Sequence, residues 1–169
     1  MQFPTPTSAD AQDAKAYVSE CVCPEWMNGY LVADGSHFPL SAKPGFYGET
    51  FFDRKSKYSL NCQVSCHCQN LMGVLLTGDK LVVMPHNLLI ADYAVGMPGS
   101  VHDAYAFQQT RVAQEHGDLL GDNHWIWADS AYPSETWCVV PFKKPKNGRL
   151  TRDQKTFNYY MSRVSACFF

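Results

Sequence analysis

Two short apolar runs that each end in an aspartate constrain the fold of this chain most. Tyr30-Leu-Val-Ala leads into Asp34, and Trp125-Ile-Trp-Ala leads into Asp129. Such runs predict buried strands, and the reactive groups of open α/β sheets gather at strand ends. Neighbouring carboxylates repel each other unless a cation lies between them, and Mg²⁺ prefers carboxylate oxygen. The pattern is compatible with a metal site, although an aspartate after a strand is most often an ordinary turn or cap residue.

The remaining patterns predict three helices and three further strands. Helices are expected over 8–22, over 100–116, and from Thr151 onward, and strands within 46–64, 88–95 and 139–142. Ser100 to Asp103 fits a capping box, which gives Asp103 a structural role at the start of its helix. This order predicts one α/β domain with a mixed sheet.

Composition excludes several classes of protein. The 169 residues are 46% apolar with a formal net charge of -2, which is unlike a disordered chain. No stretch approaches the roughly 20 apolar residues that span a bilayer, and the start of the chain lacks a basic signal-peptide region. We therefore expect an intracellular protein without a membrane partner.

Seven cysteines raise the question of zinc. Cys62 and Cys66 have the spacing of a zinc knuckle, with His67 and Cys68 beside them. No second knuckle follows, so a zinc-binding module is a minor alternative to buried or incidental thiols.

Basic residues form two groups that could contact DNA phosphates. These residues are Arg54, Lys55 and Lys57, expected at a turn, and Lys143, Lys144 and Lys146 before the last helix. A solvated loop explains the same residues at least as well.

Six motifs, in order, resemble the catalytic domain of PIF/Harbinger-type transposases, which belong to the DDE superfamily of endonucleases. They are Gly29-Tyr-Leu-Val-Ala-Asp-Gly35, Phe52-Asp-Arg-Lys-Ser-Lys-Tyr-Ser-Leu-Asn61, Gly96-Met-Pro-Gly-Ser-Val-His-Asp103, Trp127-Ala-Asp-Ser-Ala-Tyr-Pro133, Val140-Pro-Phe-Lys-Lys144 and Phe157-Asn-Tyr-Tyr-Met-Ser-Arg163. The resemblance implies an RNase H-like mixed sheet flanked by helices, two Mg²⁺ or Mn²⁺ ions and cleavage of DNA in the nucleus. It also implies that a separate DNA-binding protein can be a partner, and it leaves the oligomeric state open.

The resemblance assigns the acids. Asp34 matches the first catalytic, metal-binding aspartate. Asp129 best matches the second, because its strand lies beside the first in this fold. Asp103 is also a family motif residue, but the capping interpretation ranks it below Asp129 as a ligand.

The chain departs from the family in two places. The family's third acid is a glutamate on the last helix, whereas here the sequence after Val164 is Ser-Ala-Cys-Phe-Phe and contains none. Residues 64–81 interrupt a strand that the family pattern expects to be continuous. On this interpretation 1–28 is a helical arm and 29–169 is the nuclease domain, incomplete at its C-terminus.

Both departures begin with Val-Ser, at Val64 and at Val164, and these dipeptides can be encoded as a 5′ splice site. Lys80 can supply the closing AG. The hypothesis is that both segments are translated introns, and the alternative is a genuine loop at 64–81. With the third acid missing, we expect little or no nuclease activity. The second functional candidate is a non-catalytic DNA-binding or interaction module of transposon origin.

Overall fold

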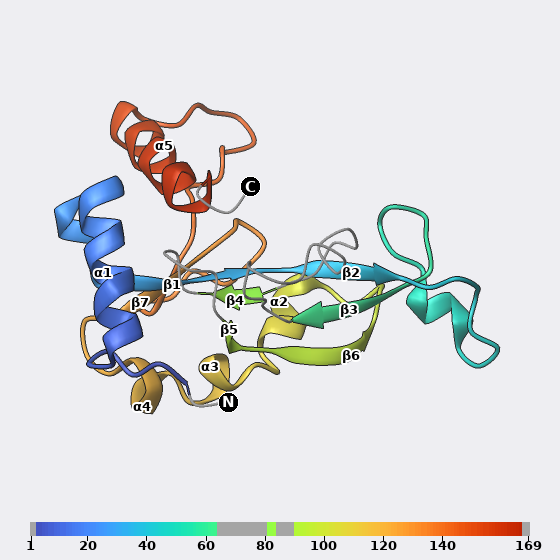
Figure 1. Cartoon of the computed structure of the whole chain (residues 1–169). Helices are drawn as coiled ribbons and strands as arrows, with labels where there is room; N and C mark the ends of the chain where they lie inside the picture. Colours follow the sequence, from blue (N-terminus) through green and yellow to red (C-terminus); the bar gives the residue numbers. More distant parts are fainter. Residues whose placement is uncertain (1–2, 64–80, 84–89, 167–169) are drawn as a thin grey trace.

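Two β-sheets form the centre of the structure, a computed structural model that describes residues 3–63, 81–83 and 90–166 (Figure 1). Five strands form one sheet in the order β5-β4-β1-β7-β8, and three form the other in the order β2-β3-β6. The five strands are β1 (Gly29–Asp34), β4 (Leu81–Val83), β5 (Ile90–Asp92), β7 (Trp125–Ala128) and β8 (Cys138–Val139). The three are β2 (Ser36–Pro39), β3 (Ser59–Gln63) and β6 (Ala94–Pro98).

The five-stranded sheet is mixed, as the sequence predicts. β1 runs parallel to β7, and β7 runs parallel to β8, whereas β4 is antiparallel to both β1 and β5. The three-stranded sheet is antiparallel throughout. The expected single sheet is thus divided in two among the described residues.

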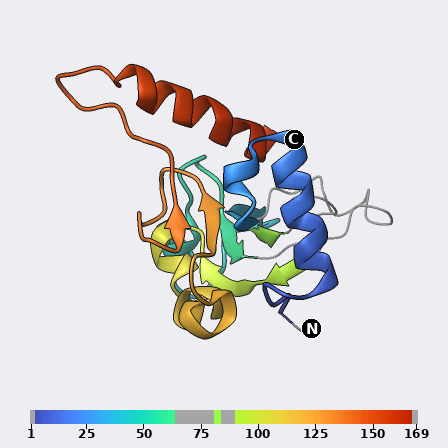
Figure 2. The same ribbon diagram turned by 90° about the vertical axis from the view of Figure 1, so that its left-hand side faces the viewer.

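Helices cover both faces of the five-stranded sheet. They are α1 (Ala9–Cys21), α2 (Asp103–Phe107), α3 (Arg111–Gln114), α4 (His116–Leu120) and α5 (Arg152–Ala166), with 3₁₀ turns η1 (Pro24–Trp26) and η2 (Gly48–Phe51). The red helix α5 lies on one side of the sheet, and the gold helix α4 lies on the other (Figure 2). Among the described residues, no helix is both long and apolar enough to span a bilayer.

Successive side chains of β1 and β7 point to opposite faces of the sheet, so the hydrophobic core is divided into two clusters. Ala33 and Ala128 belong to the larger cluster, which α2, α3 and α4 help to cover. Val32 and Trp127 belong to the smaller cluster, beside Met161 of α5. Successive strand residues point to opposite faces, so parallel register fixes which side chains of β1 and β7 share a face.

The first helix forms where its cap predicts. The hydroxyl of Ser8 accepts a hydrogen bond from the backbone N–H of Ala11 at 3.3 Å, which caps α1. Ala11 and Ala14 are fully buried in the larger cluster together with Phe3. The described part of the expected arm, residues 3–28, therefore packs against the same core as β1 and β7.

The helix predicted over 100–116 is wrong in its start and in its continuity. His102, rather than Ser100, is the N-cap, and its Nδ1 accepts from the N–H of Ala104. A new helix begins after Thr110, whose hydroxyl accepts from Ala113 and caps α3. The same hydroxyl donates to the carbonyl of Phe107, the last residue of α2, so Thr110 satisfies backbone groups at the end of one helix and the start of the next.

The last helix begins as predicted. Thr151 Oγ1 accepts from the N–H of Gln154 at 3.2 Å, and the N–H of Thr151 donates to Gln154 Oε1 at 3.0 Å. This reciprocal pair is a complete capping box. The cysteine cluster at 66–68 and the segment after 166 lie outside the described residues.

Candidate functional site

Asp34 and Asp129 lie at neighbouring strand ends. In the parallel pairing of β1 with β7, Ala33 is in register with Ala128, and each aspartate is the next residue along its strand. Adjacent strands lie about 4.8 Å apart, so the structure brings these two acids together.

Both carboxylates are oriented by a hydrogen bond from the turn that follows. Asp34 Oδ1 accepts from the N–H of Gly35 at 2.6 Å, and Asp129 Oδ1 accepts from the N–H of Ala131. Asp34 is half-buried and Asp129 is exposed. The pair therefore lies where the edge of the core meets solvent, which is where a hydrated cation could reach it.

Strand alternation places both aspartates on the face that α5 covers. Ala33 and Ala128 point to the larger cluster, so the residues before and after them point to the opposite face. That face carries the smaller cluster, where Met161 and Val164 of α5 are buried. The last helix is thus the element best placed to supply a further side chain to this pair.

Asp103 lies elsewhere. It is the first residue of α2, it is buried, and its carboxylate accepts from Asn61 Nδ2 at 3.4 Å. Asn61 belongs to β3 and is in register with His37 of β2, in the three-stranded sheet. The structure places Asp103 against this second sheet, whereas Asp34 and Asp129 end strands of the first.

The two basic groups lie apart. Asp53 Oδ1 accepts from the backbone N–H groups of Lys55 and Lys57, which forms the expected turn with their side chains exposed. This turn belongs to the β2–β3 connection at one end of the molecule, while the connection from β8 to α5 carries Lys143 beside the last helix (Figure 1). The groups therefore do not form one continuous patch.

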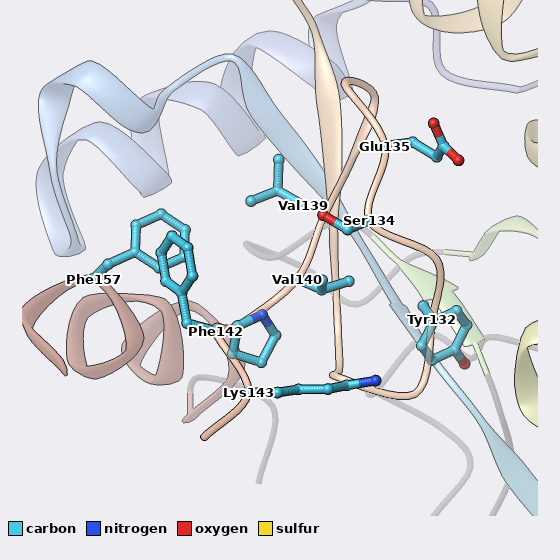
Figure 3. Close-up of a pocket in the computed structure, with 9 residues that line it drawn as sticks. Tyr132, Ser134, Glu135, Val139, Val140, Phe142, Lys143 and Phe157 are labelled. Carbon is cyan, nitrogen blue, oxygen red and sulfur yellow. The ribbon is translucent and has the colours of Figure 1, made fainter. Parts of the chain in front are cut away.

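A pocket of about 440 Å³, which the sequence analysis did not identify, adjoins the turn after Asp129 (Figure 3). Its walls include Tyr132, Val140 and Phe142, and Lys143 extends along it toward Tyr132. Phe142 contacts Phe157 of α5 with ring centroids 5.2 Å apart. The only signal in the sequence was the motif Val-Pro-Phe-Lys-Lys, whose phenylalanine follows the strand.

Two titratable groups, half-buried His124 and buried Asp92, have structural roles away from this edge. Burial and the nearby charge of Lys15 lower the pKa of His124, and Lys15 Nζ lies 2.9 Å from His124 Nε2. Burial raises the pKa of Asp92, whose Oδ2 accepts from the N–H of Val112 at 2.7 Å. These contacts attach α1 and α3 to the sheets.

Within the described ranges 3–63, 81–83 and 90–166, no group of three or more histidine, cysteine, aspartate or glutamate side chains is suited to one metal ion. Asp34 and Asp129 alone would need water, substrate or a further residue to complete an ion's coordination.

Comparison with known proteins points to one family. A family model described as a DDE superfamily endonuclease matches residues 76–167, which include Asp103 and Asp129; Asp34 precedes the matched segment. "Putative nuclease HARBI1" of Homo sapiens and that of Bos taurus are each 24% identical over 115 residues, covering 68% of this chain and 28% of the relative. The protein of the same name from Rattus norvegicus is 25% identical over 113 residues, covering 67% of this chain and 27% of the relative.

The chain spans only about a quarter of the length of these curated relatives. No solved structure matches it.

Proposed function

The chain belongs to the DDE superfamily endonucleases, and from this membership we propose that it is a divalent-metal-dependent DNA endonuclease domain of transposase origin. The observation that carries the proposal is the pairing of Asp34 with Asp129 at adjacent parallel strand ends. Two carboxylates held side by side suit Mg²⁺ or Mn²⁺, because these ions prefer oxygen ligands.

The order of the five strands supports an RNase H-like arrangement. The resemblance implies that the two acid-bearing strands are neighbours, and β1 and β7 are adjacent and parallel. The same order supports Asp129 rather than Asp103 as the partner of Asp34, since Asp103 packs against Asn61 of the other sheet. We propose Asp34 and Asp129 as the catalytic ligands, and Asp103 as a positioning residue for α2.

The residues around this edge suit a DNA phosphate backbone. A divalent ion bound at such a site polarises a phosphoryl oxygen and lowers the pKa of bound water. Asp34 and Asp129 would bind and orient the ion, while Lys143, Lys144 and Lys146 contact phosphates on the α5 side of the sheet. Arg54, Lys55 and Lys57 lie at the far end, so we propose that they contact DNA beyond the cleavage point.

We further propose that this 169-residue polypeptide holds an ion weakly and cleaves DNA little or not at all. No glutamate occurs in α5 (Arg152–Ala166), the helix that covers the face of the two aspartates. Met161 is buried on this face, and position 165 follows it by four residues, the spacing at which helical side chains are neighbours. We therefore choose position 165 to test the effect of adding a glutamate.

A plasmid-nicking assay in Mn²⁺ tests the function. We expect no measurable nicking by the chain itself, and Mn²⁺-dependent nicking by Ser165→Glu that is lost when Asp34→Asn is added. Ser165→Gln is the matched control, because it adds the same bulk without the charge. Nicking that persists in Asp34→Asn would contradict the assignment of this aspartate.

The second candidate is a non-catalytic DNA-binding module of the same origin. The exposed basic turn and the lack of a glutamate in α5 favour it. DNA binding that is equally strong in EDTA and in Mn²⁺, with no nicking by Ser165→Glu, would support this candidate. Nuclear location and a separate DNA-binding partner remain proposals from the family.

A further inference from the structure

The two sheets share a long strand. β1 ends at Asp34 and β2 begins at Ser36, with Gly35 alone between them, and the pair runs as one ribbon across the molecule (Figure 1). This long strand has an antiparallel neighbour along both halves: β4 pairs with β1, and β3 pairs with β2. β3 and β4 are separated in the chain by residues 64–80.

The registers of these two pairings agree once residues 64–80 are removed. In a regular antiparallel ladder, the residue numbers of the two partners in each pair add up to the same sum along the whole ladder. The total is 98 in every β2–β3 pair, such as His37 with Asn61, and 115 in every β1–β4 pair, such as Ala33 with Val82. The difference is 17, which is the number of residues in 64–80.

The next strands give a looser match, because the register shifts within both of their ladders. β5 and β6 are separated only by Tyr93, and they pair with β4 and β3 respectively. The pairs nearest to Tyr93, Val82 with Asp92 and Gln63 with Ala94, have totals of 174 and 157, which differ by 17. On the far side of each shift the totals are 173 and 158, so these ladders are compatible with the offset but do not fix it.

We propose that residues 64–80 are a 17-residue insertion into one continuous strand, and that the form in which Gln63 is joined to Leu81 builds the complete nuclease sheet. A slip of one residue would turn a strand's side chains to the other face, so the constant offset of 17 along β1 and β2 is a specific result. The bounds of β3 and β4 leave Val64 and Lys80 as the ends of the segment, and these are also the residues whose possible codons can supply the two ends of a splice site.

The insertion point lies beside the candidate metal site. In the joined strand, Leu81 keeps Asp34 as its partner, and Gln63 comes to lie opposite Gly35. Joining the two would make the ladder continuous across Gly35, whose N–H donates to the Asp34 carboxylate. The inference about the strand is independent of the proposed function, whereas its consequence for metal binding rests on that function.

Three deletions test the inference in the full chain. Removing 64–80 keeps the register, while removing 64–79 or 64–81 shifts it by one residue in opposite directions. We expect deletion of 64–80 to raise Tm by about 5–10 °C, because it shortens the chain that must be closed between the two paired strands. We expect both off-register deletions to lower Tm, because they misplace side chains along the joined strand. Equal Tm values for all three, or a lower Tm for the 64–80 deletion than for the full chain, would overturn the proposal.

Two further measurements distinguish the insertion itself from its consequence for metal binding. Replacing 64–80 with 17 Gly and Ser residues should leave Tm close to that of the full chain, because the segment acts by its length. A Tm rise of more than a few degrees would contradict this reading. Mn²⁺ binding by the 64–80 deletion should be several-fold tighter than binding by the full chain. A raised Tm without Mn²⁺ binding would support the insertion and contradict the proposed function.

Discussion

The two sheets bury different kinds of groups. On the five-stranded sheet, buried strand residues such as Leu31, Ile126 and Trp127 are apolar on both faces. On the three-stranded sheet, Ser59 and Asn61 are almost fully buried. The first sheet is thus stabilised mainly by apolar contact, and the second depends on hydrogen bonds that must be satisfied.

The acids divide by burial, and buried acids occur on both sheets: Asp92 of β5 is buried on the five-stranded sheet and accepts from the N–H of Val112. Asp53 and Asp103 are buried beside the three-stranded sheet, where they accept hydrogen bonds from a backbone turn and from Asn61. Asp34 and Asp129 lie at the ends of neighbouring strands of the five-stranded sheet, and each accepts a hydrogen bond from the turn that follows it. The comparison teaches that burial and position at a strand end, and not the residue type, separate structural acids from candidate ligands.

The largest expected loss of stability comes from removing a large apolar side chain from the five-stranded sheet. Trp127 is 2% exposed, its Nε1 donates to the carbonyl of Gly29 at 2.8 Å, and its ring lies 4.8 Å from that of Trp26. Trp127→Ala should lower the free energy of unfolding by about 3–5 kcal/mol in urea titrations. Tyr159→Ala, on an exposed side chain of α5, is the control and should change stability little. Similar losses in both variants would contradict this account of the core.

The second-largest expected loss of stability tests the buried hydrogen bonds beside the three-stranded sheet. Asp103→Ala should lower the free energy of unfolding by about 1–3 kcal/mol, because it leaves the buried Asn61 amide without this acceptor. Asp129→Ala should cost far less, because Asp129 is exposed. Thermal melts of the two variants make the comparison. A larger loss of stability in Asp129→Ala than in Asp103→Ala would contradict the structural role of Asp103.

A smaller, pH-dependent effect comes from the contact between α1 and the sheet. The pKa of His124 in the folded chain lies below its unfolded value, so the folded state favours the neutral ring. Its contribution to stability is therefore complete above the unfolded pKa of about 6.5 and is lost as pH falls through the lower, folded pKa. We expect Tm to fall by a few degrees between pH 7 and pH 5, and to fall less in His124→Gln. An unchanged pH dependence in that variant would exclude this cause.

The smallest effect concerns DNA. Lys143→Ala should weaken binding to a DNA duplex a few-fold and reduce the slope of log K against log salt by about 1, because one phosphate contact is lost. Lys57→Ala, at the distant turn, gives the matched comparison within the other basic group. Fluorescence anisotropy at several salt concentrations measures both. If the slope of log K against log salt is unchanged in Lys143→Ala, this lysine does not contact a DNA phosphate.

Local chemistry made much of this fold predictable. The capping patterns at Ser8 and Thr151 predicted the starts of two helices, and the apolar run before Asp129 predicted β7. These signals are reliable because they act over only a few residues. The start at Ser100 was wrong, since the N–H of that residue donates to the carbonyl of Thr50 in a distant segment. Sequence alone could not exclude such a contact.

The candidate site was predictable in part for the same reason. The runs before Asp34 and Asp129 mark the two strand ends, but only the register of β1 with β7 shows that the ends adjoin. The pocket beside Phe142 was missed, because its walls come from a loop, a strand end and α5, which no local pattern connects.

Mn²⁺ binding by single-aspartate variants tests the central claim most directly. Titration of the chain with Mn²⁺, followed by electron paramagnetic resonance of the free ion, gives a Kd for each variant. We predict that Asp34→Asn and Asp129→Asn each weaken binding at least about tenfold, since each removes one charged ligand. Asp103→Asn should bind as the parent chain does. Loss of binding in Asp103→Asn alone, with Asp34→Asn unchanged, would contradict the account.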